Sequence, residues 1–432
     1  MGRFLIHNFG CRASQADGAS LAGSLARTGL RPTSDIHHAD LVILNTCTVT
    51  SAADQEVRQV VRRVHRQNPD ARILVTGCYA QRSPAELAAL PGVRWVVGNT
   101  HKARIPEILG EEAAKIPFHG QIHVGDIFGL HEFVAAPVEE TAGDRTRPNL
   151  KIQDGCNNRC SFCIIPSVRG MSRSMPMDRV IDEVGALALR YREIVLSGIN
   201  LGRWGRDLEG RPRLVVLVDR LLKETEVGRL RLSSVEPLDL SDELLGIIAE
   251  SRRIARFVHA PLQSGSDAVL RRMRRRYRAR HYADRIRKAR RLMPEAAIGA
   301  DVMVGFPGET DAEFEESRRF IEIMPYTYLH VFTYSERPGT PAAALAEPVP
   351  MPVRKQRNQV LRELAARKNL EFRERFVGRR LPVVTLADGA LSDNYIRVEL
   401  AVPRPANRLV DVEVEAITAA GLRERSPMTV IG

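Results

Sequence analysis

In the first quarter of the chain, hydrophobic residues gather in short runs separated by longer amphipathic stretches. The short runs have the length of buried strands, and the stretches between them repeat apolar positions with the helical period. The strand-like runs are 3–7, 41–44, 73–75 and 95–97, and the helical stretches are 18–28, 55–67 and 84–90. This alternation predicts an α/β fold, with an open parallel sheet domain over residues 1–110.

A second and longer series of strands and helices follows. Six strand-like runs lie at 150–153, 194–196, 230–233, 257–260, 298–304 and 328–332, and helical stretches separate them at 177–190, 241–250, 280–292 and 311–323. Six such repeats predict a partial (β/α)6 barrel over residues 148–365, with active groups at the carboxyl ends of its strands. Residues 111–147, which run into a Gly-, Pro- and acid-rich stretch, are interpreted as a connection between the two domains.

The last part of the chain loses this alternation. Five prolines between 338 and 352 precede a predicted helix over 353–376, and strand-like runs follow at 381–386, 394–400 and 409–416. The pattern predicts a small β-barrel over residues 372–432, a fold that often binds single-stranded nucleic acid. Its charge is nearly balanced, with nine Arg against eight acids from Phe372 onward. Its lone Tyr395 offers a stacking surface, with a structural role as the alternative.

Composition indicates a cytoplasmic protein. Hydrophobic residues make up 44% of the 432 positions and charged residues 27%, which is too apolar for disorder. No apolar run approaches the roughly 18 residues of a membrane span, and the N-terminus shows no cleavable signal. In a cytosolic setting, the six cysteines indicate metal ligation or redox chemistry rather than disulfides.

Three cysteines follow three of the N-terminal strands. Cys11, Cys47 and Cys78 come directly after the first, second and third strand-like runs. Because parallel strands end at the same edge of a sheet, these thiols are expected to converge in one crevice. A single buried cysteine is more often apolar filler. Three in the same relation to three strands favour a metal or cluster site.

The other three cysteines form a C-x3-C-x2-C loop. Cys156, Cys160 and Cys163 follow the first strand of the predicted barrel. Zinc prefers four closed ligands, and the closest further candidate, His131, lies 25 positions upstream. An iron–sulfur cluster held by three thiolates would instead leave one iron open to a substrate or cofactor. Structural zinc remains the alternative.

Positive charge is concentrated in one stretch. Between Arg252 and Arg291 there are fifteen Arg or Lys and two acids, whereas the whole chain carries a net charge of +12. Such a strip binds phosphates by releasing counterions, and together with the cysteines it favours a nucleic-acid partner. The alternative is a solvated, Arg-rich helix face. His259, His281 and His330 are scattered along the sequence, and structural roles are expected for them.

The cysteine loop, with Phe162 before its third cysteine, resembles the radical S-adenosylmethionine (radical SAM) superfamily. Joined to an upstream three-cysteine domain, it resembles the methylthiotransferases of that superfamily over nearly the whole chain. Further segments that resemble this family are 196–202 (LSGINLG), 232–237 (LSSVEP), 261–266 (PLQSGS) and 304–310 (VGFPGET). One departure is Ser14, three positions after the first cysteine, where the family commonly has Asn.

Three branches of this family differ in substrate. Residues 46–50 (TCTVT), 329–335 (LHVFTYS) and 337–340 (RPGT) most resemble the branch that acts on N6-threonylcarbamoyladenosine in tRNA. The branches for isopentenyladenosine tRNA and for a ribosomal protein are the nearest alternatives. A non-catalytic RNA-binding factor with structural metal, and an electron-transfer protein, are alternatives from other classes.

The resemblance implies two 4Fe–4S clusters and S-adenosylmethionine as cofactors. Cys156, Cys160 and Cys163 would hold the catalytic cluster, whose open iron binds S-adenosylmethionine, and Cys11, Cys47 and Cys78 the second, which carries or supplies sulfur. The product would carry a methylthio group on carbon 2 of the adenine. The implied partners are a tRNA anticodon loop and an external electron donor, with no DNA and no membrane. The C-terminal barrel resembles the family's RNA-binding TRAM module. Candidate contacts to S-adenosylmethionine are Phe162, Gly198, Asn200, Glu236, Gln263 and Gly305.

Overall fold

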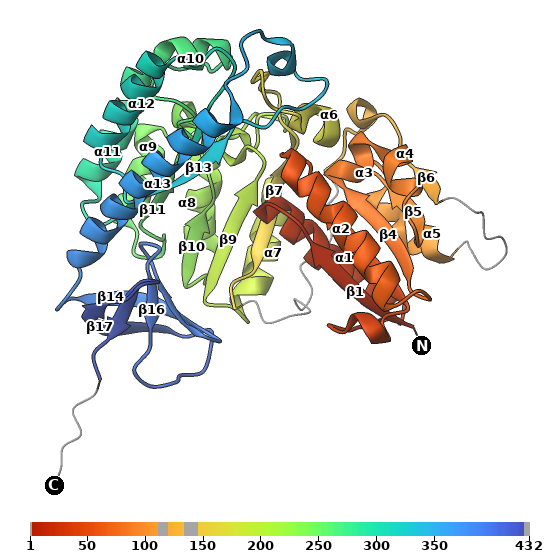
Figure 1. The fold of residues 1–432 in the computed structure, drawn as a ribbon. Coiled ribbons are helices and arrows are strands. Elements are labelled where there is room, and N and C mark those ends of the chain that lie inside the picture. The colour runs from red at the N-terminus through yellow and green to blue at the C-terminus, as the bar shows by residue number, and fades with distance from the viewer. Residues whose placement is uncertain (1, 111–119, 134–145, 427–432) are drawn as a thin grey trace.

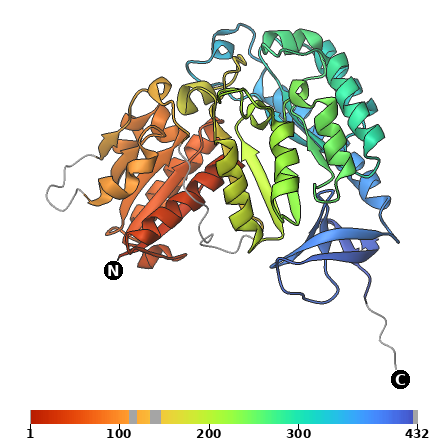
Figure 2. The same ribbon diagram turned by 180° about the vertical axis from the view of Figure 1, so that it is seen from behind.

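The structure is a computed structural model that describes residues 2–110, 120–133 and 146–426. An N-terminal α/β unit lies beside a central barrel, and a small C-terminal barrel lies below the central one (Figure 1). The view from behind shows the same arrangement (Figure 2). Much of the predicted connection over 111–147 falls on 111–119 and 134–145, which lie outside the described residues.

The N-terminal unit is a six-stranded parallel sheet with the order β2-β1-β3-β4-β5-β6. Its strands are β1 (Arg3–Asn8), β2 (Arg31–Pro32), β3 (Leu41–Thr46), β4 (Arg72–Gly77), β5 (Val93–Val97) and β6 (Gln121–His123). Its main helices are α1 (Arg12–Arg27), α2 (Ser51–Gln67), α3 (Cys78–Arg82), α4 (Pro84–Ala88) and α5 (Ile105–Gly110). The four predicted strands are present. Strands β2 and β6 are too short to show a hydrophobic pattern, and β6 extends the sheet beyond residue 110.

The central unit contains the six predicted parallel strands. They are β7 (Asn149–Asp154), β9 (Glu193–Gly198), β10 (Arg229–Leu232), β11 (Phe257–His259), β12 (Ala297–Val304) and β13 (Tyr328–Thr333). A two-residue strand, β8 (Arg173–Ser174), pairs antiparallel with β7. Leu230 links the two halves of the barrel, because it bridges to Ile254 and exchanges backbone hydrogen bonds with the chain before β11. The partial (β/α)6 barrel is therefore confirmed.

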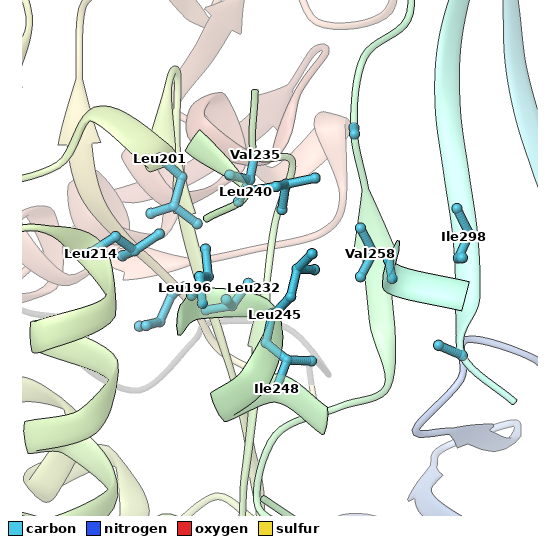
Figure 3. Packing of buried hydrophobic residues seen from close by; sticks show 14 of the residues in the cluster. Leu196, Leu201, Leu214, Leu232, Val235, Leu240, Leu245, Ile248, Val258 and Ile298 are labelled. Carbon is cyan, nitrogen blue, oxygen red and sulfur yellow. The ribbon is translucent and has the colours of Figure 1, made fainter. Parts of the chain in front are cut away.

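Helices cover the outside of this barrel. They are α7 (Met177–Ala188), α8 (Leu214–Glu224), α9 (Asp242–Glu250), α10 (Asp267–Arg272), α11 (Ala279–Leu292) and α12 (Asp311–Ile323). Alternate strand residues such as Leu196, Leu232, Val258 and Ile298 pack against them in the main core (Figure 3). Because side chains alternate along a strand, the residues between these positions face the inside of the barrel.

The C-terminal unit is a closed five-stranded barrel with the order β14-β15-β16-β18-β17. Its strands are β14 (Arg380–Leu386), β15 (Gly389–Ser392), β16 (Arg397–Glu399), β17 (Leu409–Ile417) and β18 (Leu422–Glu424). The long helix α13 (Met351–Glu374) packs against β13 and leads into the C-terminal barrel. Phe257 of β11 and Phe376 belong to the same apolar cluster as the small barrel's interior, so the two barrels share a core.

The N-terminal unit contacts both edges of the partial barrel. Helix α1 packs against β7, and α3 packs against α6 (Ile165–Arg169). Beyond β13, Ser335 Oγ accepts a hydrogen bond from the Ser51 N–H at 3.0 Å, and Arg337 forms a buried ion pair with Asp54. The N-terminal unit thus spans the open side of the barrel and presents its cysteine-bearing edge to it. In the part of the chain that the structure describes, no helix combines the length and apolar character needed to cross a membrane.

Candidate active site

The first three cysteines lie at the carboxyl ends of adjacent strands, as predicted. Cys11 caps the start of α1, Cys47 follows β3, and Cys78 begins α3. Gly10 has φ +85°, and a Cβ there would lie 2.6 Å from the Cβ of Cys47, so the Cys11 loop can approach Cys47 only with glycine at this position. Burial, with the nearby Cys78 and Cys11 thiols, raises the pKa of Cys47 to about 12. The structure thus brings the three thiols to one edge of the sheet, with Cys47 and Cys78 buried and Cys11 exposed.

A buried arginine lies beside this cysteine group. Arg169, at the end of α6, is 1% exposed and donates from Nε to Cys78 Sγ at 3.3 Å. Its terminal nitrogens donate to Asp17 at 3.1 Å and to Asp154 at 2.9 Å. Ser14 departs from the family pattern. Its Oγ lies 3.7 Å from Cys11 Sγ and accepts a hydrogen bond from a terminal nitrogen of Arg169 at 3.4 Å. Sequence reasoning did not identify Arg169, because no local motif marks it.

The second cysteine group occupies the loop after β7. The backbone N–H of Cys156 donates to Gly170 O at 3.0 Å, and the N–H of Asn158 donates to Cys156 Sγ at 3.4 Å. Ser161 ties the loop to the end of α10, because its hydroxyl donates to Arg272 O at 2.8 Å. Burial raises the pKa of Cys163 to about 12, and the Cys160 and Cys156 thiols act in the same direction.

Two further side chains point at the sulfurs of this loop. Asn200 Nδ2 donates to Cys156 Sγ at 3.7 Å, and an Arg275 terminal nitrogen donates to Cys160 Sγ at 3.2 Å. Arg275 also forms an ion pair with Glu236. Arg275 belongs to the basic strip, but its side chain is 5% exposed and turned toward the cysteines. Residues far from the loop in sequence thus surround it.

The other candidate residues lie around the same strand ends. Phe162 packs against an apolar cluster that includes Phe306. A Cβ at Gly198 would lie 2.9 Å from the side chain of Gln153, and a Cβ at Gly305, which has φ +72°, would lie 2.3 Å from Arg354 Cγ. Gln263 has φ +66°, and its backbone pairs with β12. Contacts with neighbouring protein side chains therefore require glycine at positions 198 and 305, in addition to any close approach of a cofactor.

The donor sets suit iron–sulfur clusters better than single ions. Among the described residues, only His259, Asp301 and His330 bring three His, Cys, Asp or Glu ligand atoms within 4.8 Å of one another. In neither cysteine group do all three sulfurs lie within 4.8 Å of one another, and sets of cysteine thiolates are the ligands that hold iron–sulfur clusters. Asn200 Oδ1 and Ser233 Oγ are buried at neighbouring strand ends with no hydrogen-bond partner within the described structure. Such orphaned acceptors fit a polar cofactor beside the loop.

The inside of the barrel is polar. His259 Nε2 lies 3.1 Å from Asp301 Oδ2, and His330 Nδ1 lies 3.1 Å from Asp301 Oδ1. The Tyr328 hydroxyl lies 2.7 Å from His259 Nδ1. His259 and His330 are thus brought together across three strands, whereas His281 is exposed on α11. We call this group (Tyr328, His259, Asp301 and His330) the interior polar cluster.

Comparison with known proteins assigns both halves of the site to families. Residues 3–98 match an uncharacterised protein family, UPF0004, and residues 150–321 match the radical SAM superfamily. The cobalamin-bound radical S-adenosylmethionine methyltransferase TsrM of Kitasatospora setae has a similar fold, with a TM-score of 0.58 and 16% identity. That similarity covers 79% of this chain and 76% of TsrM. The partial barrel and its three-cysteine loop define a radical SAM protein.

Sequence relatives narrow the class. The threonylcarbamoyladenosine tRNA methylthiotransferase MtaB of Bacillus subtilis is 38% identical over 89% of this chain and 85% of its own length. MtaB of Aquifex aeolicus is 36% identical over 94% of this chain and 98% of its own length. A tRNA-2-methylthio-N(6)-dimethylallyladenosine synthase of Novosphingobium aromaticivorans is 35% identical over 88% of this chain and 86% of its own length. This chain belongs to the radical SAM methylthiotransferase family.

Proposed function

We propose that this protein is a tRNA methylthiotransferase that converts N6-threonylcarbamoyladenosine, beside the anticodon, to its 2-methylthio derivative. The observation that carries the proposal is the similarity to MtaB proteins, which extends over both cysteine-bearing units and 85–98% of the first two relatives' lengths. We place the reaction in the cytoplasm, with electrons from an external donor.

Each cysteine group receives one 4Fe–4S cluster in this proposal. Cys156, Cys160 and Cys163 hold the cluster that binds S-adenosylmethionine, and Cys11, Cys47 and Cys78 hold the one that carries sulfur. When bound, the first cluster and S-adenosylmethionine supply a 5′-deoxyadenosyl radical. Asn200 and Arg275 orient the loop by donating to two of its sulfurs.

The remaining candidates are assigned to S-adenosylmethionine. Asn200 offers its unpartnered Oδ1 to the cofactor, and Glu236 lies close by, paired with Arg275. Phe162 forms an apolar wall, and Gln263, Gly198 and Gly305 shape the strand ends around it. The N-terminal unit, which spans the open side of the barrel, excludes water from the radical.

The interior polar cluster supports the threonylcarbamoyl substrate. That substituent carries a carboxylate, a hydroxyl and a urea-like linkage, all able to form hydrogen bonds. An apolar dimethylallyl group packed against His259, Asp301 and His330 would remove water from these groups and return no hydrogen bond. Dimethylallyladenosine is the second candidate substrate, because a synthase for its methylthio derivative is 35% identical to this chain.

Nucleoside analysis tests the proposal. The protein is expressed in a bacterium that lacks its own threonylcarbamoyladenosine methylthiotransferase, and digested tRNA is analysed by mass spectrometry. We expect 2-methylthio-N6-threonylcarbamoyladenosine, and none of it with the matched Cys47→Ala variant. A methylthio group found only on dimethylallyladenosine would select the second candidate. Zinc without acid-labile sulfide in the purified protein would contradict the proposal that the protein is an enzyme. It would indicate a non-catalytic RNA-binding factor.

A further inference from the structure

Several cations around the interior of the site are each paired with a buried or half-buried carboxylate. Lys151 pairs with Asp17 and Asp154, as Arg169 does. Arg229 and Arg231 pair with Glu193, and Arg275 pairs with Glu236. Such pairing is expected, because an unpaired charge is costly to remove from water.

Arg12 departs from this rule. It is half-buried in the first turn of α1, next to Cys11, and has no carboxylate partner among residues 2–110, 120–133 and 146–426. Its carbonyl accepts a hydrogen bond from Asn149 Nδ2 at 2.6 Å, which fixes the turn against β7. A guanidinium in this position, close to the proposed sulfur-carrying cluster, is available to an anionic ligand.

Tyr395 of the C-terminal barrel positions the Arg12 side chain. An Arg12 terminal nitrogen donates to the Tyr395 hydroxyl at 3.3 Å, and the guanidinium carbon lies 6.0 Å from the centre of the Tyr395 ring. The Tyr395 ring in turn lies 5.8 Å from that of Tyr328 in the interior polar cluster. Burial and Tyr395 raise the pKa of Tyr328, whereas the nearby Arg12 acts to lower it. Tyr395 therefore lies between Arg12 and Tyr328, which places Arg12 close to the interior polar cluster.

We propose that Arg12 binds the carboxylate of the substrate's threonylcarbamoyl group and so selects this nucleoside over those with uncharged N6 substituents. Carbon 2 and N6 lie on the same edge of adenine, on either side of N1. A base whose carbon 2 lies at the Cys11 site can therefore place its N6 substituent within reach of the adjoining Arg12. A guanidinium can grip a carboxylate with two parallel hydrogen bonds, which a neutral amide cannot reproduce. The inference rests on the proposed function.

Synthetic anticodon stem-loops test Arg12 directly. Two RNAs carry either threonylcarbamoyladenosine or its carboxamide, in which the carboxylate is replaced by a neutral amide. Binding to the cluster-loaded protein is measured by fluorescence anisotropy, and methylthio transfer is measured in parallel. The unaltered protein is expected to bind the carboxylate RNA about tenfold to a hundredfold more tightly, as lost charged hydrogen bonds usually cost. Equal binding of the two RNAs would overturn the inference.

Variants then assign the preference to the side chain. Arg12→Gln is expected to abolish the preference for the carboxylate by weakening binding of the carboxylate RNA more than that of the carboxamide RNA, and a retained preference would refute the role of Arg12. Because Arg12 adjoins Cys11, iron and sulfide content and the cluster's electron paramagnetic resonance spectrum are checked. If Arg12→Gln fails to assemble its cluster, the Arg12→Lys variant is tested instead, since lysine keeps the positive charge but cannot donate two parallel hydrogen bonds. A reduced preference supports the inference and an unchanged one contradicts it.

The outcome separates this inference from the proposed function. If the unaltered, cluster-loaded protein transfers no methylthio group to the carboxylate RNA, the proposed substrate is wrong. If it modifies both RNAs with equal affinity and rate, the reaction stands and the role of Arg12 is wrong. Tyr395→Phe, which removes the hydroxyl that positions Arg12, is expected to weaken the preference in the same direction.

Discussion

The Nε of Arg169 donates a hydrogen bond to the Sγ of Cys78 at 3.3 Å, while the same guanidinium binds Asp154, two residues before Cys156. One buried side chain therefore connects the two cysteine groups, which belong to different structural units. Arg169 also binds Asp17 of α1, which Lys102 and Lys151 contact as well. This network lines a cavity of about 290 Å³ between the two units. We infer that it fixes the relative position of the two cluster sites.

Replacing Arg169 by Gln is expected to destabilise the protein by about 3 kcal/mol, because buried carboxylates lose their counterion. It also removes a positive charge and an N–H···S bond from the Cys78 site, so the reduction potential of that cluster should fall. Chemical denaturation and a redox titration followed by electron paramagnetic resonance measure the two effects. Arg220→Gln, in an exposed ion pair on α8, is the control and should change neither. If the stability and the cluster's reduction potential are unaltered in Arg169→Gln, the network does not fix the relative position of the two cluster sites.

Cys160→Ala is expected to abolish reductive cleavage of S-adenosylmethionine, because the cluster proposed for the barrel loop would lose one of its three ligands. Formation of 5′-deoxyadenosine with dithionite as reductant, measured by liquid chromatography, provides the readout. Cleavage at the rate of the unaltered protein would disprove the assignment of this loop.

Cys47→Ala is expected to leave cleavage of S-adenosylmethionine intact and to stop methylthio transfer. The physical reason is that Cys47 belongs to the other cysteine group, at the end of β3. Nucleoside mass spectrometry and the cleavage assay are run on the same preparation. Normal transfer would exclude the N-terminal cysteines as the sulfur-carrying site.

Glu193 is predicted to control stability in acid. Burial alone would raise its pKa, but Arg231, Arg147 and Arg229 hold it at about 2, below the ordinary value of 4.5. A carboxyl group whose pKa is lowered in the folded protein stabilises the fold at pH values above its unfolded-state pKa. This stabilisation is lost as the pH falls toward 2. Glu193→Gln should therefore cost about 3 kcal/mol at pH 7, and the difference from the unaltered protein should shrink below pH 4.5.

Urea denaturation between pH 3 and 7 measures this difference, with Glu209→Gln, in an exposed turn, as a control that should show none. Arg231 also donates to the carbonyls of Ser392 and Asp393, so Glu193→Gln should loosen the attachment of the C-terminal barrel. Faster limited proteolysis after α13 would report that loosening. A stability difference that stays constant down to pH 3 would mean that another group carries the acid sensitivity.

Within the described residues, the basic strip contains some arginines that pair with carboxylates and others that do not. Arg272 pairs with Glu313 and Arg285 with Asp242, whereas Arg274 and Arg276 are exposed and line a hollow beside Cys160. Replacing Arg274 and Arg276 together by Gln should weaken tRNA binding and reduce the slope of log affinity against log salt by about 1.5. Filter binding at several salt concentrations measures the slope. Arg319→Gln, exposed but paired with Glu315, is the matched control. An unchanged slope in the double variant would make the strip a solvated surface.

Much of the fold could be predicted from the sequence, because its signals are local. Strand and helix periods placed four N-terminal strands, six barrel strands and the long helix near their observed positions. The positions of Cys11, Cys47 and Cys78 after strand-like runs placed them at one sheet edge. The short strands β2 and β6 could not be predicted, since Arg31–Pro32 and Gln121–His123 contain no apolar run.

The sequence by itself determined the two cysteine groups and the strands that carry them, since spacing and alternation are properties of neighbouring residues. Only the tertiary structure decided what surrounds them. Arg169 reaches Cys78 across 91 positions, and Arg275 reaches Cys160 across 115. Arg12 and Tyr395 meet across 383 positions. Such contacts depend on how the three units pack, because burial selects a partner by proximity in space and leaves no repeating pattern along the chain.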